Sequence, residues 1–227
     1  MKCLHICNGF LESKVHENLY LELSSNKIQQ TVYYYTRSYN KTSKLKENKD
    51  FPKNINIIKS KSLKLYHRVF FRKKISYLYK DITLKIDLNQ FDIIHAATLF
   101  SDGALAYKIF KKKKIPYIVA IRGTDVNSFS KYRPDLYGLA ANILKNAKKI
   151  IFISKSLEKN FFKLPYVKKM NHIITQKTTI IYNGLNNFWL ENSRFYNTKK
   201  PYKVLYIGNL SKNKNVTRLA HSILFLR

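Results

Sequence analysis

The sequence predicts an α/β protein in which a parallel sheet is covered by helices on both faces. Short runs such as Ile150-Ile151-Phe152-Ile153 are apolar throughout, as is typical of strands buried on both faces of a parallel sheet. Segments with apolar residues at helical spacing separate these runs, which favours alternating strands and helices. Five of the six glycines follow an expected strand or begin an expected helix, where turns are required.

The expected elements follow one another along the whole chain. Strands are predicted at 4–7, 31–35, 55–58, 91–95, 115–121, 150–153, 179–182 and 204–210. Helices are predicted around Val15, Leu19 and Leu23, over 63–86, 101–114 and 136–146, after a cap at Ser154, and over 216–225. In the helix over 63–86, the expected core-facing residues are Leu65, Val69, Ile75, Leu78, Ile82 and Ile86. The polar segment 37–53 is expected to be a long loop.

The amino-acid composition indicates a folded protein with a packed core, but it does not identify a function. The 227 residues are 45% hydrophobic, which is enough for a packed core, and their formal net charge is +30. Such a charge attracts nucleic acid, anionic lipid headgroups or phosphorylated substrates, although a bias toward Lys, Asn, Ile and Tyr codons explains it equally well. Cys3 and Cys7 are too far apart on one extended strand to form a disulfide. We therefore expect reduced thiols and a cytoplasmic protein, with neither a signal peptide nor a membrane span.

Candidate site residues follow the ends of the expected strands, because ligands of parallel sheets bind at that edge. The most specific local motif is Arg122-Gly123-Thr124-Asp125. Arg122 could bind a phosphate or carboxylate through two hydrogen bonds, and Asp125 could orient a sugar hydroxyl. Gly123 is expected to permit an unusual backbone angle. The alternative is an internal Arg–Asp pair that braces the loop.

Two further positions belong to the same predicted edge. His95 ends an earlier strand, where it could donate to a phosphate or accept a hydroxyl proton, or be purely structural. Gly9 follows the first strand and could let the backbone approach a ligand. The remaining histidines are interpreted as structural or exposed. We expect no metal and no bound cofactor, because the sequence lacks the common zinc, redox, hydrolase, dinucleotide and Walker motifs.

The last residues predict a strand, a glycine loop with a lysine and a helix, an arrangement that favours anions. A single strand and helix cannot bury a core, so this site is expected to be incomplete. We divide the chain into a domain over 1–185, a linker over 186–200 and the start of a second, truncated domain over 201–227. The basic, aromatic stretch around Arg72-Lys73-Lys74 could contact single-stranded nucleic acid or a membrane, or be a solvated face.

Taken in order, these segments resemble the family 4 retaining glycosyltransferases of the GT-B fold. The resemblance rests on Phe91 to Ala96 with Gly103, Ile115 to Asp125, Ile150 to Ser154, Ile181 to Leu185, and Val204 to Asn215. It implies two Rossmann-like domains that face each other across a cleft, with the acceptor bound by the first and a nucleotide-sugar bound by the second. Residues 1–90 fit only loosely.

The resemblance also implies roles for individual residues. Gly9 would lie in the acceptor-side loop, and Arg122 falls where many members have a His near the transferred sugar. Gly208 and Lys214 match the glycine and the pyrophosphate-binding lysine, and Asn209 replaces a frequent second phosphate-binding Arg. The double glycine after the first strand and the acidic E-x(7)-E segment of the donor domain are absent.

The resulting hypothesis is transfer of a hexose or related sugar from a nucleotide-sugar to a glycan or lipid-linked acceptor in cell-surface polysaccharide synthesis. We expect the chain to be inactive alone, with a separate chain supplying the rest of the second domain. We also expect it to lie in the cytoplasm, peripherally on the inner face of an anionic membrane, and nucleic acid is not an expected partner. The alternatives are a non-catalytic basic module that binds membrane or nucleic acid, and a degraded gene product.

Overall fold

The computed structural model describes residues 1–36, 51–185, 187–192, 205–208, 210 and 214–224. The chain divides into two compact units, Met1–Asn186 and Asn187–Arg227. Most of the loop predicted at 37–53 lies outside the described residues, as does the linker from 193 to 200.

The first unit contains a seven-stranded parallel sheet with the order β3-β2-β1-β4-β5-β6-β7. Its strands are β1 Lys2–Ile6, β2 Gln29–Tyr34, β3 Ile55–Lys59, β4 Ile93–Ala96, β5 Tyr117–Ile121, β6 Lys149–Phe152 and β7 Thr178–Ile180. The helices of eight or more residues in this unit are α1 Lys14–Ser25, α2 Phe71–Lys85, α3 Ser101–Lys113, α5 Tyr137–Asn146 and α6 Lys155–Phe162. The shorter helical segments are η2 Leu65–Arg68, η3 Leu88–Gln90, η4 Asp125–Phe129, α4 Ser130–Tyr132, η5 Pro134–Leu136, α7 Pro165–Lys168 and α8 Asn171–Thr175. The predicted α/β class is confirmed.

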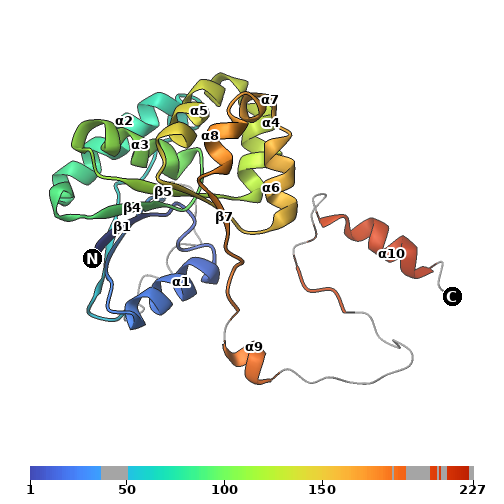
Figure 1. Cartoon of the computed structure of the whole chain (residues 1–227). Coiled ribbons are helices and arrows are strands. Elements are labelled where there is room, and N and C mark those ends of the chain that lie inside the picture. Colours follow the sequence, from blue (N-terminus) through green and yellow to red (C-terminus); the bar gives the residue numbers. More distant parts are fainter. Residues whose placement is uncertain (37–50, 186, 193–204, 209, 211–213, 225–227) are drawn as a thin grey trace. The chain divides into compact units, whose positions relative to one another are not determined.

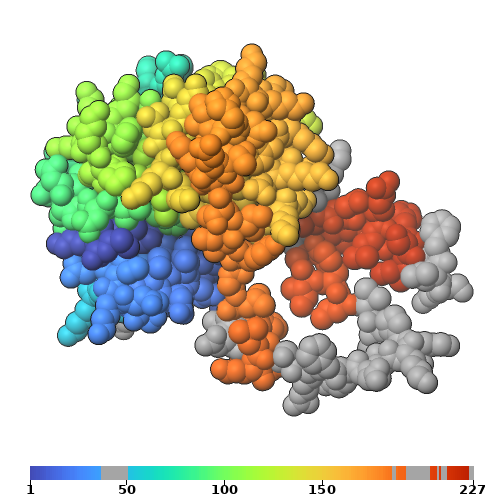
Figure 2. Space-filling view, in the orientation of Figure 1, coloured from blue at the N-terminus to red at the C-terminus, as the bar shows by residue number. Residues whose placement is uncertain are grey.

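Helices cover both faces of this sheet unequally. α1 lies on one face, while α2, α3 and α5 lie on the other (Figure 1). Each face of the sheet carries its own hydrophobic core, and successive side chains of β2 point to opposite faces. Val32 packs in the core on the side of α1, and Tyr33 packs in the core on the other side. In the space-filling view, the blue N-terminal residues lie below the green and yellow residues of the same unit (Figure 2).

The sequence pattern was wrong about some of the residues that two helices bury. Leu65 and Val69 are 68% and 69% exposed, whereas Ile75, Leu78, Ile82 and Ile86 of the same predicted helix are buried. The reason is a break in the helix: Leu65 lies in the short 3₁₀ turn η2, and α2 begins only at Phe71. α1 buries His16, Glu17 and Tyr20 rather than the predicted apolar positions.

Local signals at helix ends were more reliable. The Ser154 hydroxyl accepts a hydrogen bond from Leu157 N and caps α6, as predicted. Ser13 caps α1 through Val15 N. Cys3 and Cys7 are buried free thiols, and burial raises the pKa of Cys3 to about 12, so these thiols are unreactive in the folded protein.

The second unit consists, in its described part, of α9 Asn187–Glu191 and α10 Val216–Leu224. The predicted strand at 204–210 is wrong for residues 205–208, which are not in a strand. A strand is stable only within a sheet, and the described residues of this unit contain no second strand for it to pair with. A helix, α9, lies where the sequence predicted an irregular segment. Among the described residues of both units, no helix is long and apolar enough to cross a membrane.

Gly103 lets α3 pack closely against the loop after β4, against α5 and against β5. A Cβ atom on Gly103 would lie 3.2 Å from Thr98 O and 3.2 Å from Ile143 Cγ2. We expect Gly103→Val to lower the free energy of unfolding by about 2 kcal/mol through overpacking. Urea denaturation measures this loss, and Gly138→Val is the control, because no atom lies within 4 Å of a Cβ built at Gly138. Equal losses in both variants would contradict the packing argument.

Candidate functional site

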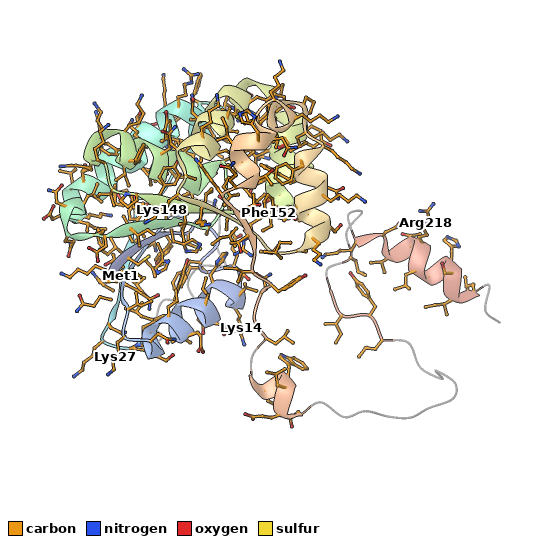
Figure 3. The ribbon with its side chains drawn as sticks, viewed as in Figure 1. Met1, Lys14, Lys27, Lys148, Phe152 and Arg218 are labelled. Carbon is orange, nitrogen blue, oxygen red and sulfur yellow. The ribbon has the colours of Figure 1, made fainter. Side chains whose placement is uncertain are left out.

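The carboxyl ends of β1, β4, β5 and β7 bring four loops to one edge of the parallel sheet, which we call the carboxyl edge. Figure 3 labels Met1 and Lys148 at the start of strands and Phe152 at the end of β6, which marks the direction of the sheet. The loops at the carboxyl edge contain Gly9, Thr98, Arg122 and Asn183. Ligands of parallel sheets bind at this edge, so its side chains form the candidate site.

Arg122 follows β5, and neutral oxygens hold its guanidinium group at the carboxyl edge. Nε donates to the carbonyl oxygen of Ala97 at 3.3 Å, and Nη1 donates to Oδ1 of Asn183 at 2.9 Å. Within the described part of the chain no carboxylate forms an ion pair with it. Partial burial lowers the pKa of Arg122, but a guanidinium stays charged in proteins. This fixed cation is therefore suited to binding an anionic group.

Asp125 lies inside the protein and braces the loop that carries Arg122. Its carboxylate accepts hydrogen bonds from the backbone N–H groups of Arg122 at 2.9 Å and Leu99 at 3.2 Å, and from that of Phe100 at 3.4 Å. Burial raises the pKa of Asp125 to about 6, and these N–H donors oppose the rise. The loop is braced, although through backbone N–H groups and not through the Arg122 guanidinium. Contact between Asp125 and a sugar stays a prediction.

His95 lies within β4 and is only 6% exposed, so it does not face the edge as the sequence predicted. Because β1 and β4 are paired, His5 stands beside it, and their Nδ1 atoms are 3.0 Å apart. Burial is the main cause that lowers the pKa of His95 to about 3, with smaller contributions from His16 and Arg122. The ring is therefore neutral at pH 7 and belongs to the core beneath the edge; its proposed catalytic role stays a prediction.

The loop after β1 contains Gly9, and His16, predicted to be structural or exposed, lies just beyond it. His16, in the first turn of α1, is 8% exposed and is the side chain nearest to a Cβ built on Gly9, at 3.8 Å. Its Nδ1 has no hydrogen-bond partner among the described atoms. Burial, then Arg122, lowers the pKa of His16 to about 4. Figure 3 labels Lys14, where α1 begins, and Lys27, just beyond its end.

The expectation of an unusual backbone angle at Gly123 is wrong. No described glycine has a positive φ. The chain turns from β5 into helical geometry at Gly123, which any residue can adopt. A Cβ built on Gly123 would lie 3.8 Å from Nδ2 of Asn127, an ordinary contact distance, so local packing does not require glycine here.

Asp102, in the first turn of α3, was missed as a site residue. It is fully buried, and its Oδ1 accepts hydrogen bonds from Tyr35 Oη at 2.8 Å and Asn8 N at 3.2 Å. Its Oδ2 accepts one from Thr98 Oγ1 at 3.0 Å. Burial raises the pKa of Asp102 to about 7, and the donors Tyr35 and Thr98 oppose the rise. This carboxyl group therefore connects the loops that follow β1, β2 and β4. The only feature of the sequence that could have identified Asp102 is an acidic residue at the start of a helix that follows a strand.

The residues predicted to bind the donor diphosphate lie in the second unit. Gly208 and Lys214 are exposed, and Asn209 lies outside the described residues. Their binding role stays a prediction. In the described ranges there is no group of three or more His, Cys, Asp and Glu side chains that could hold a metal ion.

Comparison with known proteins gives the context for this edge. A family model described as Glycosyltransferase Family 4 matches residues 14–187, and no curated protein sequence matches the chain. Similar solved structures include Anabaena HepE in complex with UDP and glucose, at 14% identity and a TM-score of 0.50, over 82% of this chain and 45% of that one. A UDP-glucosyltransferase from Polygonum tinctorium capable of glucosylating indoxyl matches at 11% identity and a TM-score of 0.50, over 81% and 52% of the two chains.

A third structure is an enzyme of another kind. The UDP-GlcNAc 2-epimerase from Neisseria meningitidis, bound to UDP-GlcNAc, matches at 14% identity and a TM-score of 0.51, over 81% of this chain and 47% of that one. This chain thus spans about half the length of these three proteins, and such low identities show a shared fold alone. The family match covers most of the chain, including Thr98, Arg122 and Asn183 of the carboxyl edge, whereas Gly9 precedes it. The chain belongs to Glycosyltransferase Family 4.

Proposed function

We propose that this chain is the acceptor-side part of an enzyme that transfers a sugar from a nucleotide-sugar to a glycan or lipid-linked acceptor in cell-surface polysaccharide synthesis. The observation that carries the proposal is the Arg122 guanidinium, which neutral oxygens fix at the carboxyl edge within the family-matched residues. Anabaena HepE binds UDP and glucose, and this supports a nucleotide-sugar as the donor. Because the same fold also serves an epimerase, the fold itself does not choose the reaction.

Each edge residue then receives a role in the transfer. Arg122 stabilises negative charge that develops in the transition state, and Asp125 and Asp102 hold the loops in place. Gly9 and Gly123 leave room for the acceptor and the transferred sugar. Gly208, Asn209 and Lys214 bind the diphosphate of the donor, and we expect no metal requirement because protein cations provide the positive charge.

The donor-binding half requires more than residues 187–227 provide. The described part of that segment contains two helices and no strand, and α10 buries none of its residues. A sheet with helices is needed to hold a nucleotide at a strand edge. We therefore propose that turnover requires polypeptide in addition to residues 1–227, whether it lies in the same chain or in a partner.

A cellular assay tests the proposed function with any such partner present. Membranes and cytosol from cells with and without the gene are given labelled UDP-glucose or UDP-GlcNAc, and label in lipid-linked and polymeric products is counted. We expect one labelled product to disappear without the gene and to return with the wild-type chain. If every labelled product persists without the gene for both donors, the proposal is wrong for these sugars.

We also propose that the start of α2 docks on an anionic membrane. Val69 and Phe70 are 69% and 52% exposed, and Arg72 and Lys73 follow them after the buried Phe71. The Lys73 ammonium lies 4.9 Å from the centre of the Phe70 ring. Exposed apolar side chains beside cations are typical of surfaces that enter the headgroup region of anionic bilayers.

Replacing both apolar residues, as Val69→Ser with Phe70→Ser, should weaken binding to vesicles that contain phosphatidylglycerol by about tenfold or more. Vesicle co-sedimentation measures the change. Leu84→Ser is the control, because Leu84 is 83% exposed at the other end of α2. Similar weakening by the control, or tighter binding to DNA than to vesicles, would contradict membrane docking at this surface.

A further inference from the structure

A cavity of about 350 Å³ lies between segments that follow β3 and β5, and Arg122 is not among the residues that line it. One wall is the segment 63–74, which follows β3 and begins α2, and the other is the segment 128–133. The second wall continues the loop that starts at Arg122 and that Asp125 braces. The cavity and Arg122 are therefore connected by one short, anchored piece of chain.

The charges around this cavity are all of one sign. Lys64, Arg68, Lys74 and Arg133 line it, and none of its lining residues is acidic. Lys74 is only 7% exposed, and its Nζ donates to Oγ of Ser101 at 2.9 Å, so this cation is fixed in place. Such a concentration of cations in a partly enclosed space favours a ligand with negative charge.

Two of these cations are available and one is already paired. Lys64 and Arg68 are exposed at the mouth of the cavity. Arg133 is held by Asp135, with Nε and Nη2 at 2.8 Å and 2.7 Å from the two carboxylate oxygens. Binding should therefore depend mainly on the two exposed cations, together with buried Lys74.

The N-terminus of α2 adds to the positive potential. α2 begins at Phe71 without a side-chain cap and without an acidic residue in its first turn. The backbone N–H of Phe71 donates to the carbonyl oxygen of Val69 at 3.0 Å, and the partial positive charge of the remaining helix start favours anions such as phosphate. Phe71 and Lys74 of this first turn both line the cavity.

Aromatic rings form the apolar part of the wall. Phe71, Phe129 and Tyr132 line the cavity, and Phe129 is fixed by stacking on Phe100, with ring centroids 4.9 Å apart. Binding pockets commonly combine such apolar walls with a few fixed charged groups. The combination suits a ring-shaped molecule that carries a phosphate.

We propose that this cavity binds the phosphate or diphosphate group of a sugar phosphate, with the sugar ring against Phe71 and Phe129. Its use as the acceptor subsite rests on the proposed function; the binding itself does not. The ligand is a phosphorylated sugar, and it can be either free in solution or attached to a lipid. Lys64 and Arg68 contact the phosphate, and Lys74 and the start of α2 supply the deeper positive charge.

Calorimetric titration of the full chain with a hexose 1-phosphate, and with the unphosphorylated hexose, tests binding without any donor or transfer. Vesicles of zwitterionic phosphatidylcholine that carry a prenyl-diphosphate-linked sugar provide the second arm. We expect Lys64→Gln with Arg68→Gln to weaken binding about tenfold or more. The control Lys112→Gln with Lys113→Gln removes the same charge from exposed residues at the end of α3.

Loss of hexose phosphate binding in the cavity variant alone supports the site with a soluble ligand. Loss of vesicle binding alone, again specific to the cavity variant, supports it with a lipid-linked ligand. Equal weakening by the two double variants, equal binding of the hexose, or no binding in either arm would overturn the proposal. None of these results depends on sugar transfer, so failure of this site and failure of the proposed function are distinguishable.

Discussion

Arg122→Ala is expected to lower the rate of sugar transfer by about 10²-fold, as is usual when one fixed group that stabilises transition-state charge is removed. The assay is the gene-dependent labelled product described above, measured in cells that contain only the variant chain. Arg122 has an exposed part and no structural ion pair among the described residues. Its removal should therefore leave the fold intact while removing the cation from the carboxyl edge.

The physical reason lies in how the guanidinium is held. Ala97 O and Asn183 Oδ1 fix its position without neutralising its charge. Partial burial reduces the screening of that charge by water, and a preorganised group needs little reorganisation during the reaction. Arg122→Lys keeps a charge but loses the planar fork that makes both bonds, so we expect its rate to lie between those of wild type and Arg122→Ala.

Lys148→Ala is the matched control for this experiment. It removes the same charge immediately before β6, at the opposite edge of the sheet (Figure 3). Its rate should stay within about twofold of wild type, because exposed charges more than a Debye length apart are screened from one another. Equal rates for Arg122→Ala and wild type would remove Arg122 from the mechanism.

The sheet could be predicted from the sequence because its strands are short, apolar and bounded by turns. Ile93–Ala96 and Lys149–Phe152 are examples, found within two residues of their predicted bounds. The position of Arg122 could also be predicted, since it follows directly from where a strand ends. These features depend on neighbours in the chain, and local patterns report them.

Features that depend on packing between distant segments could not be predicted. His95 was placed at the edge, but pairing of β4 with β1 sets it beside His5 in the core. Asp125 and Asp102 receive their donors from residues up to 94 positions away. Likewise, Leu65 fitted a helical pattern, yet the chain breaks the helix before α2.

Asp102→Ala is expected to lower the free energy of unfolding by about 3 kcal/mol or more, the second large effect. The replacement leaves Tyr35 Oη, Asn8 N and Thr98 Oγ1 without the acceptor that each has in the buried network. A buried donor that loses its acceptor costs about 1–3 kcal/mol. Urea denaturation measures the loss, and Asp92→Ala, at an exposed carboxylate that accepts from Lys2 N, should cost much less.

Asp102→Asn separates the charge of this group from its hydrogen bonds. The amide oxygen can still accept from Tyr35 and Asn8, and the amide nitrogen can donate to the Thr98 hydroxyl, as a protonated carboxyl group would. The asparagine is therefore a permanent substitute for the protonated aspartic acid. It should cost far less stability than the alanine.

The difference in the free energy of unfolding between Asp102→Asn and wild type should depend on pH in a defined direction. Burial raises the pKa of Asp102 from 3.8 to about 7, so the folded protein binds one more proton than the unfolded chain between these values. Protonation thus stabilises the folded wild type as the pH falls through this window, by about 1.4 kcal/mol per pH unit. The asparagine variant lacks this contribution, so its stability relative to wild type should fall from pH 8 to pH 5.

Urea denaturation of both proteins at pH 5, 6, 7 and 8 measures this difference directly. The buried histidines His5, His16 and His95, whose pKa values are lowered, destabilise the folded state at acidic pH in both proteins and cancel in the comparison. Asp125, whose pKa is raised to about 6, acts in the opposite direction in both proteins and stabilises the folded state as the pH falls. A difference that stays constant across these four pH values would show that Asp102 is ionised throughout, and the buried network would then hold a charge rather than a proton.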